Sequence, residues 1–187
     1  KELAAYYSKM RGSSDLVIHG IEGKEGNRTT YVAKISFKQL AEHFDIVPSS
    51  DAPAGVMLQR SLAVSRGRNI ARYIKDNEDF IFPELIAIVE TLDVEALAIT
   101  SICKLVLPAL SFRYFVDGQG RLFGVKDILK HAPELADNTV DVKFVLSRGV
   151  DADAQIFTDV NKTPTSPNAS QCIAMDSRQI MSTFAKD

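Results

Sequence analysis

The sequence predicts a mixed α/β fold, in which a mixed sheet is flanked by helices and begins with an N-terminal β-hairpin. Segments rich in β-branched and aromatic residues, such as 16–23 and 140–146, are typical of strands. They alternate with segments such as 121–131, in which apolar residues recur at helical spacing. Some connections are short enough for hairpins and others are long enough for crossovers, so the sheet should be mixed.

The predicted hairpin consists of strands at 16–23 and 29–36. The turn signal Lys-Glu-Gly-Asn at 24–27 separates the two strands. A short amphipathic helix should follow at 37–44, because its apolar residues are spaced for one helical face. Ser36 stands directly before it and is a preferred helix cap.

The same criteria apply to the rest of the chain. Residues 93–101 fit a helix or a loop, and the segments 45–57 and 163–168 carry the prolines and small residues of loops. Helices are predicted at 61–77, 121–131, 151–161 and 169–184, and strands at 104–107, 112–116, 140–146 and within 80–92 after Pro83.

Composition predicts one soluble domain. The 187 residues are 45% hydrophobic and 25% charged, with a net charge of −2, so no overall field attracts the chain to DNA or to an anionic membrane. Any contact with nucleic acid must come from a local patch. The apolar runs are too short to span a membrane, so no membrane partner is expected.

Cysteine and histidine usage argues against metal and disulfide scaffolds. The two cysteines form no CxxC motif and the three histidines do not cluster, so we expect no structural zinc site. A reducing, cytoplasmic location is expected. The chain begins with Lys1, and we expect a piece of a longer protein: one domain over 1–187, with a core at 15–168 and a C-terminal helix at 169–187 that leads into a further portion.

The most unusual segment is Asp117-Gly-Gln-Gly-Arg121, between a predicted strand and a predicted helix. Gly118 and Gly120 allow positive φ and close approach of another group to the backbone. The first N–H groups of the helix would point at an anion bound there. Arg121 is poorly placed for the helix dipole unless an anion lies beside it. Asp117 could hold Arg121 or a metal ion that accompanies a phosphate, and Gln119 could hydrogen-bond at the same spot.

Two plainer interpretations remain open for this segment. It could be an ordinary tight turn in which Asp117 caps the helix. It could also be a dinucleotide fingerprint, but Phe123 occupies the position of the third glycine and Gly124 comes one residue late. No GxxxxGK[ST] motif occurs, which excludes a Walker-type phosphate loop.

Asp117-Gly-Gln-Gly-Arg121 followed by Leu-Phe-Gly resembles the signature of the DGQHR family. That family is a branch of the ParB/sulfiredoxin-like superfamily, and its best-known members are the DndB proteins of bacterial DNA phosphorothioation systems. The family usually has His where this chain has Gly120, so a bound nucleotide should be turned over poorly. Three further segments agree with family blocks: Gln59-Arg60-Ser61 with Arg66 and 70–74, Phe80-Ile-Phe-Pro83, and Gln155 to Asn161 with Pro164 and Ser166.

The resemblance implies a ParB-like mixed sheet and a cleft that binds ATP, or another nucleoside triphosphate, with Mg²⁺. The catalytic residues would be Asp117, Gln119 and Arg121, and Asp117 would also hold the magnesium ion. The nucleotide-binding residues would be Gly118, Gly120, Arg121, Arg60, Arg66, Asp159, Asn161 and Lys162.

A predicted DNA-binding face lies on the helix at 61–77. Arg68, Arg72 and Lys75 fall at i, i+4 and i+7, so they share one face that suits contacts to DNA phosphates. Arg66 joins them as a position that matches the family block. A solvated helix face, offset by the acidic residues 76, 78 and 79, is the plainer alternative.

The favoured function is a DNA-binding repressor of a phosphorothioation gene cluster, modulated by the nucleotide. Its partners would be double-stranded DNA at the promoter of its own operon, the nucleotide, and further copies of itself in a homo-oligomer. Two other classes remain open: an NTPase or nuclease that acts on DNA, and a scaffold that only contacts modification proteins.

Overall fold

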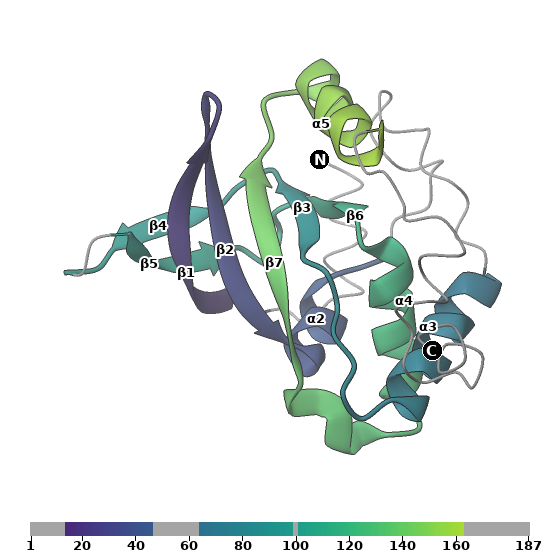
Figure 1. Ribbon diagram of the computed structural model, residues 1–187. Coiled ribbons are helices and arrows are strands. Elements are labelled where there is room, and N and C mark those ends of the chain that lie inside the picture. The colour runs from purple at the N-terminus through teal and green to yellow at the C-terminus, as the bar shows by residue number, and fades with distance from the viewer. Residues whose placement is uncertain (1–13, 47–63, 99–100, 163–187) are drawn as a thin grey trace, which may run out of the picture.

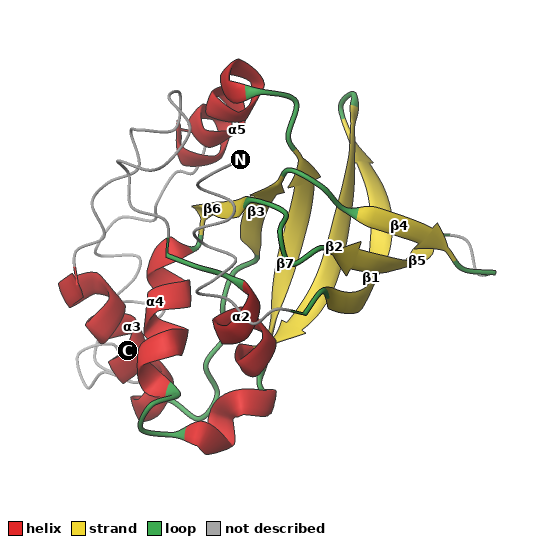
Figure 2. Cartoon of the chain, turned by 180° about the vertical axis from the view of Figure 1, so that it is seen from behind, coloured by secondary structure: helices red, strands yellow, loops and turns green. Residues whose placement is uncertain are grey.

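The computed structural model describes residues 14–46, 64–98 and 101–162, which form one mixed sheet with helices on both of its faces (Figures 1 and 2). This confirms the predicted mixed α/β class. The strands are β1 (Leu16–Glu25), β2 (Arg28–Ser36), β3 (Leu85–Val89), β4 (Asp93–Ala96), β5 (Ile102–Leu107), β6 (Arg113–Asp117) and β7 (Thr139–Leu146). The helices are α2 (Phe37–His43), α3 (Val64–Asp76), α4 (Gln119–Ile128) and α5 (Val150–Lys162), with a 3₁₀ helix, η2 (Pro133–Asp137).

The seven strands run in the order β4-β5-β1-β2-β7-β3-β6. The predicted N-terminal hairpin is confirmed as β1 and β2, which pair antiparallel from Ile21 with Val32 to Glu25 with Arg28. The β3–β7 pair is parallel and the other neighbours are antiparallel, so the sheet is mixed as predicted. β6 lies at one edge and carries the Asp117-Gly-Gln-Gly-Arg121 segment at its end.

The main core lies between the sheet and helices α2, α3 and α4. Strand alternation directs Ile18, Ile35 and Phe144 to this side, where Phe44 packs its ring 4.9 Å from that of Phe115. The start of α2 is fixed as predicted by Ser36. Its hydroxyl accepts from the Gln39 N–H at 3.1 Å, and the Gln39 side chain accepts from the Ser36 N–H, which forms a capping box.

Helices α3 and α4 pack closely because each has a glycine where they cross. A Cβ atom on Gly124 would lie 2.5 Å from Cγ2 of Ile70, and one on Gly67 would overlap the ring of Phe123. The two helices are therefore in close contact, and Gly118 joins α4 directly to the end of β6.

Helix α5 lies on the other face of the sheet. Its residues Ile156, Phe157 and Val160 pack against Tyr114 and Val116 of β6. Phe115, which lies between Tyr114 and Val116 in β6, points to the main core instead. Helices α4 and α5 thus cover opposite faces of the β3–β6 pair.

Several predicted boundaries are wrong. Residues 93–96 form strand β4 instead of a helix or loop, because β5 supplies their hydrogen-bonding partners. α4 begins at Gln119, two residues earlier than predicted, and ends at Ile128. η2 was not predicted. The predicted loops at 47–57 and 163–168 and the helix at 169–184 lie outside the described residues.

Candidate functional site

The junction between β6 and α4 turns on Gly118. This residue has φ +112° and forms the N-cap of α4. It is also buried, and a Cβ atom would lie 2.5 Å from Cγ of Leu85. Glycine is therefore required for two reasons: the positive φ disfavours other residues, and a side chain would collide with Leu85. Gly120 lies inside α4 without positive φ, so the expectation that both glycines open the loop is wrong for Gly120.

Arg121 points back to the junction. Its guanidinium donates to the Asp117 carboxylate at 2.7 Å and to the backbone carbonyl of Pro83 at 2.9 Å. The Arg121 side chain is 14% exposed and that of Asp117 is 45% exposed. A cation at a helix N-terminus opposes the helix dipole, and here a carboxylate and a carbonyl compensate for it. The expectation that Asp117 holds Arg121 is confirmed.

The third predicted catalytic residue also lies at the junction. The Gln119 side-chain amide donates to the Phe115 carbonyl at 3.2 Å, which ties the first turn of α4 to the end of β6. The structure thus brings Asp117, Gln119 and Arg121 together within one turn. Their catalytic role stays a prediction.

The junction has the elements of an anion site. The first intrahelical bond runs from the Leu122 N–H to the Gly118 carbonyl at 2.9 Å, so the N–H groups of Gly120 and Arg121 precede the hydrogen-bonding ladder of the helix. An anion there would meet these groups and would compete with Asp117 for Arg121. Among the described residues, no group of three or more His, Cys, Asp or Glu forms a metal-ligand set. A magnesium ion at Asp117 would therefore take its other ligands from phosphate and water.

The predicted cationic face is present on α3. Arg68, Arg72 and Lys75 are all exposed, whereas Ala71 and Ile74 on the adjoining face of the helix are buried. We call these three cations the α3 row. Arg60 and the side chain of Arg66 lie outside the described residues.

The predicted second block lies on α5. The Asp159 carboxylate accepts from the Gln155 amide at 2.7 Å, and the Asn161 amide donates to the Phe157 carbonyl at 2.8 Å. These contacts run along the helix, and Asp159, Asn161 and Lys162 are exposed. Helices α4 and α5 cover opposite faces of the β3–β6 pair, so this arrangement does not by itself form a cleft between them. A cleft that Asp159, Asn161 and Lys162 would share with Asp117 and Arg121 stays a prediction.

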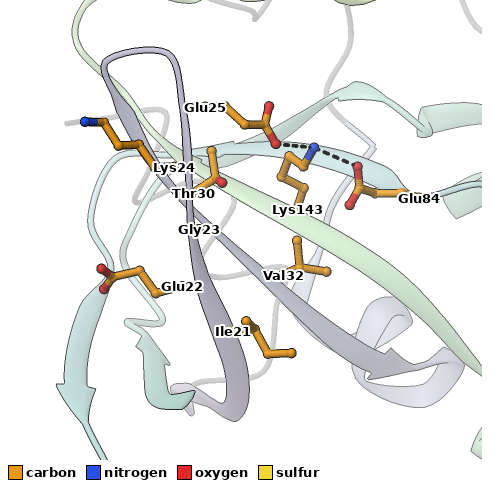
Figure 3. Close-up of a pocket in the computed structure, with 9 residues that line it drawn as sticks. All are labelled: Ile21, Glu22, Gly23, Lys24, Glu25, Thr30, Val32, Glu84 and Lys143. Carbon is orange, nitrogen blue, oxygen red and sulfur yellow. Dashed lines mark ion pairs between the residues drawn. The ribbon is translucent and has the colours of Figure 1, made fainter. Parts of the chain in front are cut away.

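Sequence reasoning missed a partly exposed ion-pair cluster around Lys143 of β7. The Lys143 ammonium lies 2.6 Å from the Glu25 carboxylate and 3.1 Å from that of Glu84 (Figure 3). Burial alone would lower the pKa of Lys143, but the hydrogen bonds and charges of the two glutamates outweigh burial and raise it. The cluster borders a shallow hollow of about 320 Å³ on the β1–β2 hairpin. Its members come from three distant segments, so no local pattern could predict it.

Helices that could span a membrane are not found in the described part of the chain. Searches of curated proteins and of solved structures find no significant match to the chain. A family model, DndB, described as DNA-sulfur modification-associated, matches residues 18–187. This match includes the junction, the α3 row and α5. Nearly the whole chain is covered, and the protein therefore belongs to the DndB family of DNA-sulfur modification-associated proteins.

Proposed function

We propose that this protein is a DNA-binding repressor of the gene cluster of a DNA-sulfur modification system, and that a nucleotide at the β6–α4 junction modulates it. The observation that carries the proposal is the α3 row, in a member of a family associated with modification of DNA. Arg68, Arg72 and Lys75 extend over about 10 Å of the helix, roughly three base-pair rises of duplex DNA.

The charge distribution supports a local contact with DNA. The whole chain has a net charge of −2, so binding must depend on a concentrated patch. The α3 row is such a patch, because all three of its cations are exposed on one face of α3, next to the face that packs on the core. Phosphate contacts of this kind position a protein on the duplex and make its affinity depend on salt.

The nucleotide would act at the Asp117–Arg121 ion pair. A phosphate group would take over the guanidinium of Arg121, and the released carboxylate of Asp117 would bind the accompanying Mg²⁺. This exchange would change the first turn of α4. Because Gly124 and Phe123 of α4 are in tight contact with α3, a displacement of α4 would move the α3 row.

The test is a gel shift with the promoter of the protein's own gene cluster, with and without ATP and Mg²⁺. We expect a specific complex whose affinity changes when Mg²⁺-ATP is added. Arg121→Ala should retain DNA binding but lose the response to nucleotide. Failure to bind this promoter at low salt would contradict the proposal, and cleavage of the DNA would favour a nuclease.

A further inference from the structure

A row of exposed apolar side chains crosses the sheet on the face turned away from the core. Ile21 on β1 is 59% exposed, Ile102 on β5 is 36% exposed, and Leu97 directly after β4 is 37% exposed. Ile21 pairs with Ile102 and with Val32 of β2, and the Leu97 N–H bonds to the Ile102 carbonyl. We call these three exposed residues and the partly buried Val32 the apolar row.

The apolar row is on the outer face because strand alternation directs the neighbouring residues inward. Cys103 and Leu105, on either side of Lys104 in β5, are buried in the main core. Helix α5 covers this face at β3 and β6, at the other end of the sheet. A contiguous apolar surface between charged residues is typical of a protein contact surface, whereas one exposed apolar residue alone needs no explanation.

A charged row lies next to the apolar row. It is reached by moving two residues along each strand in the same direction, to Glu95, Lys104, His19 and Lys34. Glu95 and Lys104 form an ion pair at 3.0 Å, and Lys104 pairs with His19 in the register of β5 and β1. The carboxylate is thus at the β4 end of this row. Lys34, which also pairs with Asp141 of β7 at 2.7 Å, is at the β2 end.

We propose that this face binds a second copy of the same chain about a two-fold axis parallel to β1 and β5. Such an axis places the apolar row against itself and reverses the charged row. Glu95 of each copy then lies opposite Lys34 of the other copy, so the dimer has two symmetry-related contacts between opposite charges. This proposal goes beyond the regulator function and does not depend on it.

The arrangement leaves the α3 row accessible. Helices α3 and α4 lie at one side of the molecule and β4 and β5 at the other, in both views (Figures 1 and 2). A dimer formed through the apolar row therefore has an α3 row at each of its outer ends. Two rows of three cations allow twice as many phosphate contacts as one.

Sedimentation velocity over a concentration series tests the proposal. The wild-type protein should change from monomer to dimer as its concentration rises. Ile21→Glu should remain monomeric throughout, because its carboxylate would face Ile102 of the other copy within an apolar contact. Ile81→Glu is the matched control, because Ile81 is 81% exposed but lies outside the apolar row. Circular dichroism should show native secondary structure for both variants.

Charge reversal tests the geometry. Lys34→Glu and Glu95→Lys should each weaken the dimer, because they place like charges opposite each other. Mixing the two variants should restore it, because each contact then joins a carboxylate and an ammonium. The proposal would be overturned by a wild-type monomer at all concentrations, by a dimer that Ile21→Glu leaves intact, or by a mixture that does not associate.

Discussion

The guanidinium of Arg121 lies 2.7 Å from the carboxylate of Asp117, so two of the charges at the junction already compensate each other. If a nucleotide binds there, Asp117 competes with its phosphates for Arg121. Asp117→Asn should therefore raise the affinity for ATP without Mg²⁺ by about five-fold, equivalent to roughly 1 kcal/mol for an ion pair near the surface. The same variant should lose the effect of Mg²⁺ on binding. Isothermal titration calorimetry measures both.

Asp127→Asn is the control for that measurement. It also removes one negative charge, but from α4, where Asp127 pairs only with Lys130 among the ion pairs described, at 3.3 Å. Its affinity for ATP should match that of the wild type. Weaker binding of Mg²⁺-free ATP to Asp117→Asn would mean that the carboxylate does not compete with phosphate.

Gly118→Ala should destabilise the protein more than Gly149→Ala. Both glycines have positive φ, +112° and +100°, so alanine is strained at either position. Only at Gly118 would the new methyl group also meet Leu85, with Cγ at 2.5 Å; at Gly149 nothing lies within 4 Å. We expect about 1 kcal/mol of lost stability at Gly149 and roughly 1–3 kcal/mol more at Gly118. Urea unfolding of the two variants gives the difference, and equal losses would show that Leu85 relaxes without cost.

The sequence was sufficient to predict the hairpin and the strand–helix junction because their signals are local. Alternation, the turn residues 24–27 and the cap at Ser36 all lie within the elements that they specify. Strand β4 was missed because all four residues of Asp93-Val-Glu-Ala96 are exposed, so no buried face imposes an apolar pattern. It is a strand because β5 pairs with it, and this pairing is a tertiary effect.

In the candidate site, too, the local contacts could be predicted from the sequence and the tertiary contacts could not. The Asp117–Arg121 pair is four residues apart on one turn, so it could be anticipated from spacing. The acceptor at Pro83 is a backbone carbonyl 38 residues away, and no residue type marks a backbone acceptor. The position of α5 opposite α4 depends on sheet order, which the sequence does not specify for long crossovers.

The contact between Gly124 and Ile70 predicts an energetic coupling between α4 and α3. Gly124→Ala should cost about 1–3 kcal/mol, because its methyl group would lie 2.5 Å from Cγ2 of Ile70. Ile70→Ala removes that atom and so relieves the closest part of the contact, although it keeps the Cβ that would lie 2.9 Å from the new methyl group. The double variant should therefore lose less stability than the sum of the two single variants, by at least about 0.5 kcal/mol. A denaturant double-mutant cycle measures the coupling, and additive losses would mean that the helices separate without cost.

Tyr114 should make the protein sensitive to alkali. Burial, and then the charge and hydrogen bond of Asp153, raise the pKa of this phenol above its usual value near 10.0. A raised pKa in the folded state means that the contribution of Tyr114 to stability is complete below pH 10.0 and declines as the pH rises further. Tyr114→Phe should lose roughly 0.5–1.5 kcal/mol at neutral pH, and its stability should fall less steeply above pH 10.0. Urea unfolding at a series of alkaline pH values checks this, and an unchanged slope would exclude Tyr114 as the cause.

The α3 row should determine how DNA binding depends on salt. Each cation that contacts a phosphate contributes about −0.9 to the slope of log K against log salt concentration. Replacing Arg68, Arg72 and Lys75 with alanine should make this slope less steep by up to about 2.7, and should weaken binding to all sequences alike at low salt. A matched triple variant at the exposed Lys24, Lys38 and Lys130 changes the net charge equally but leaves the α3 row intact. Fluorescence anisotropy over a salt series should show a shallower slope for the first variant only. If both variants change the slope equally, binding depends on overall charge, and α3 is not the surface that contacts DNA.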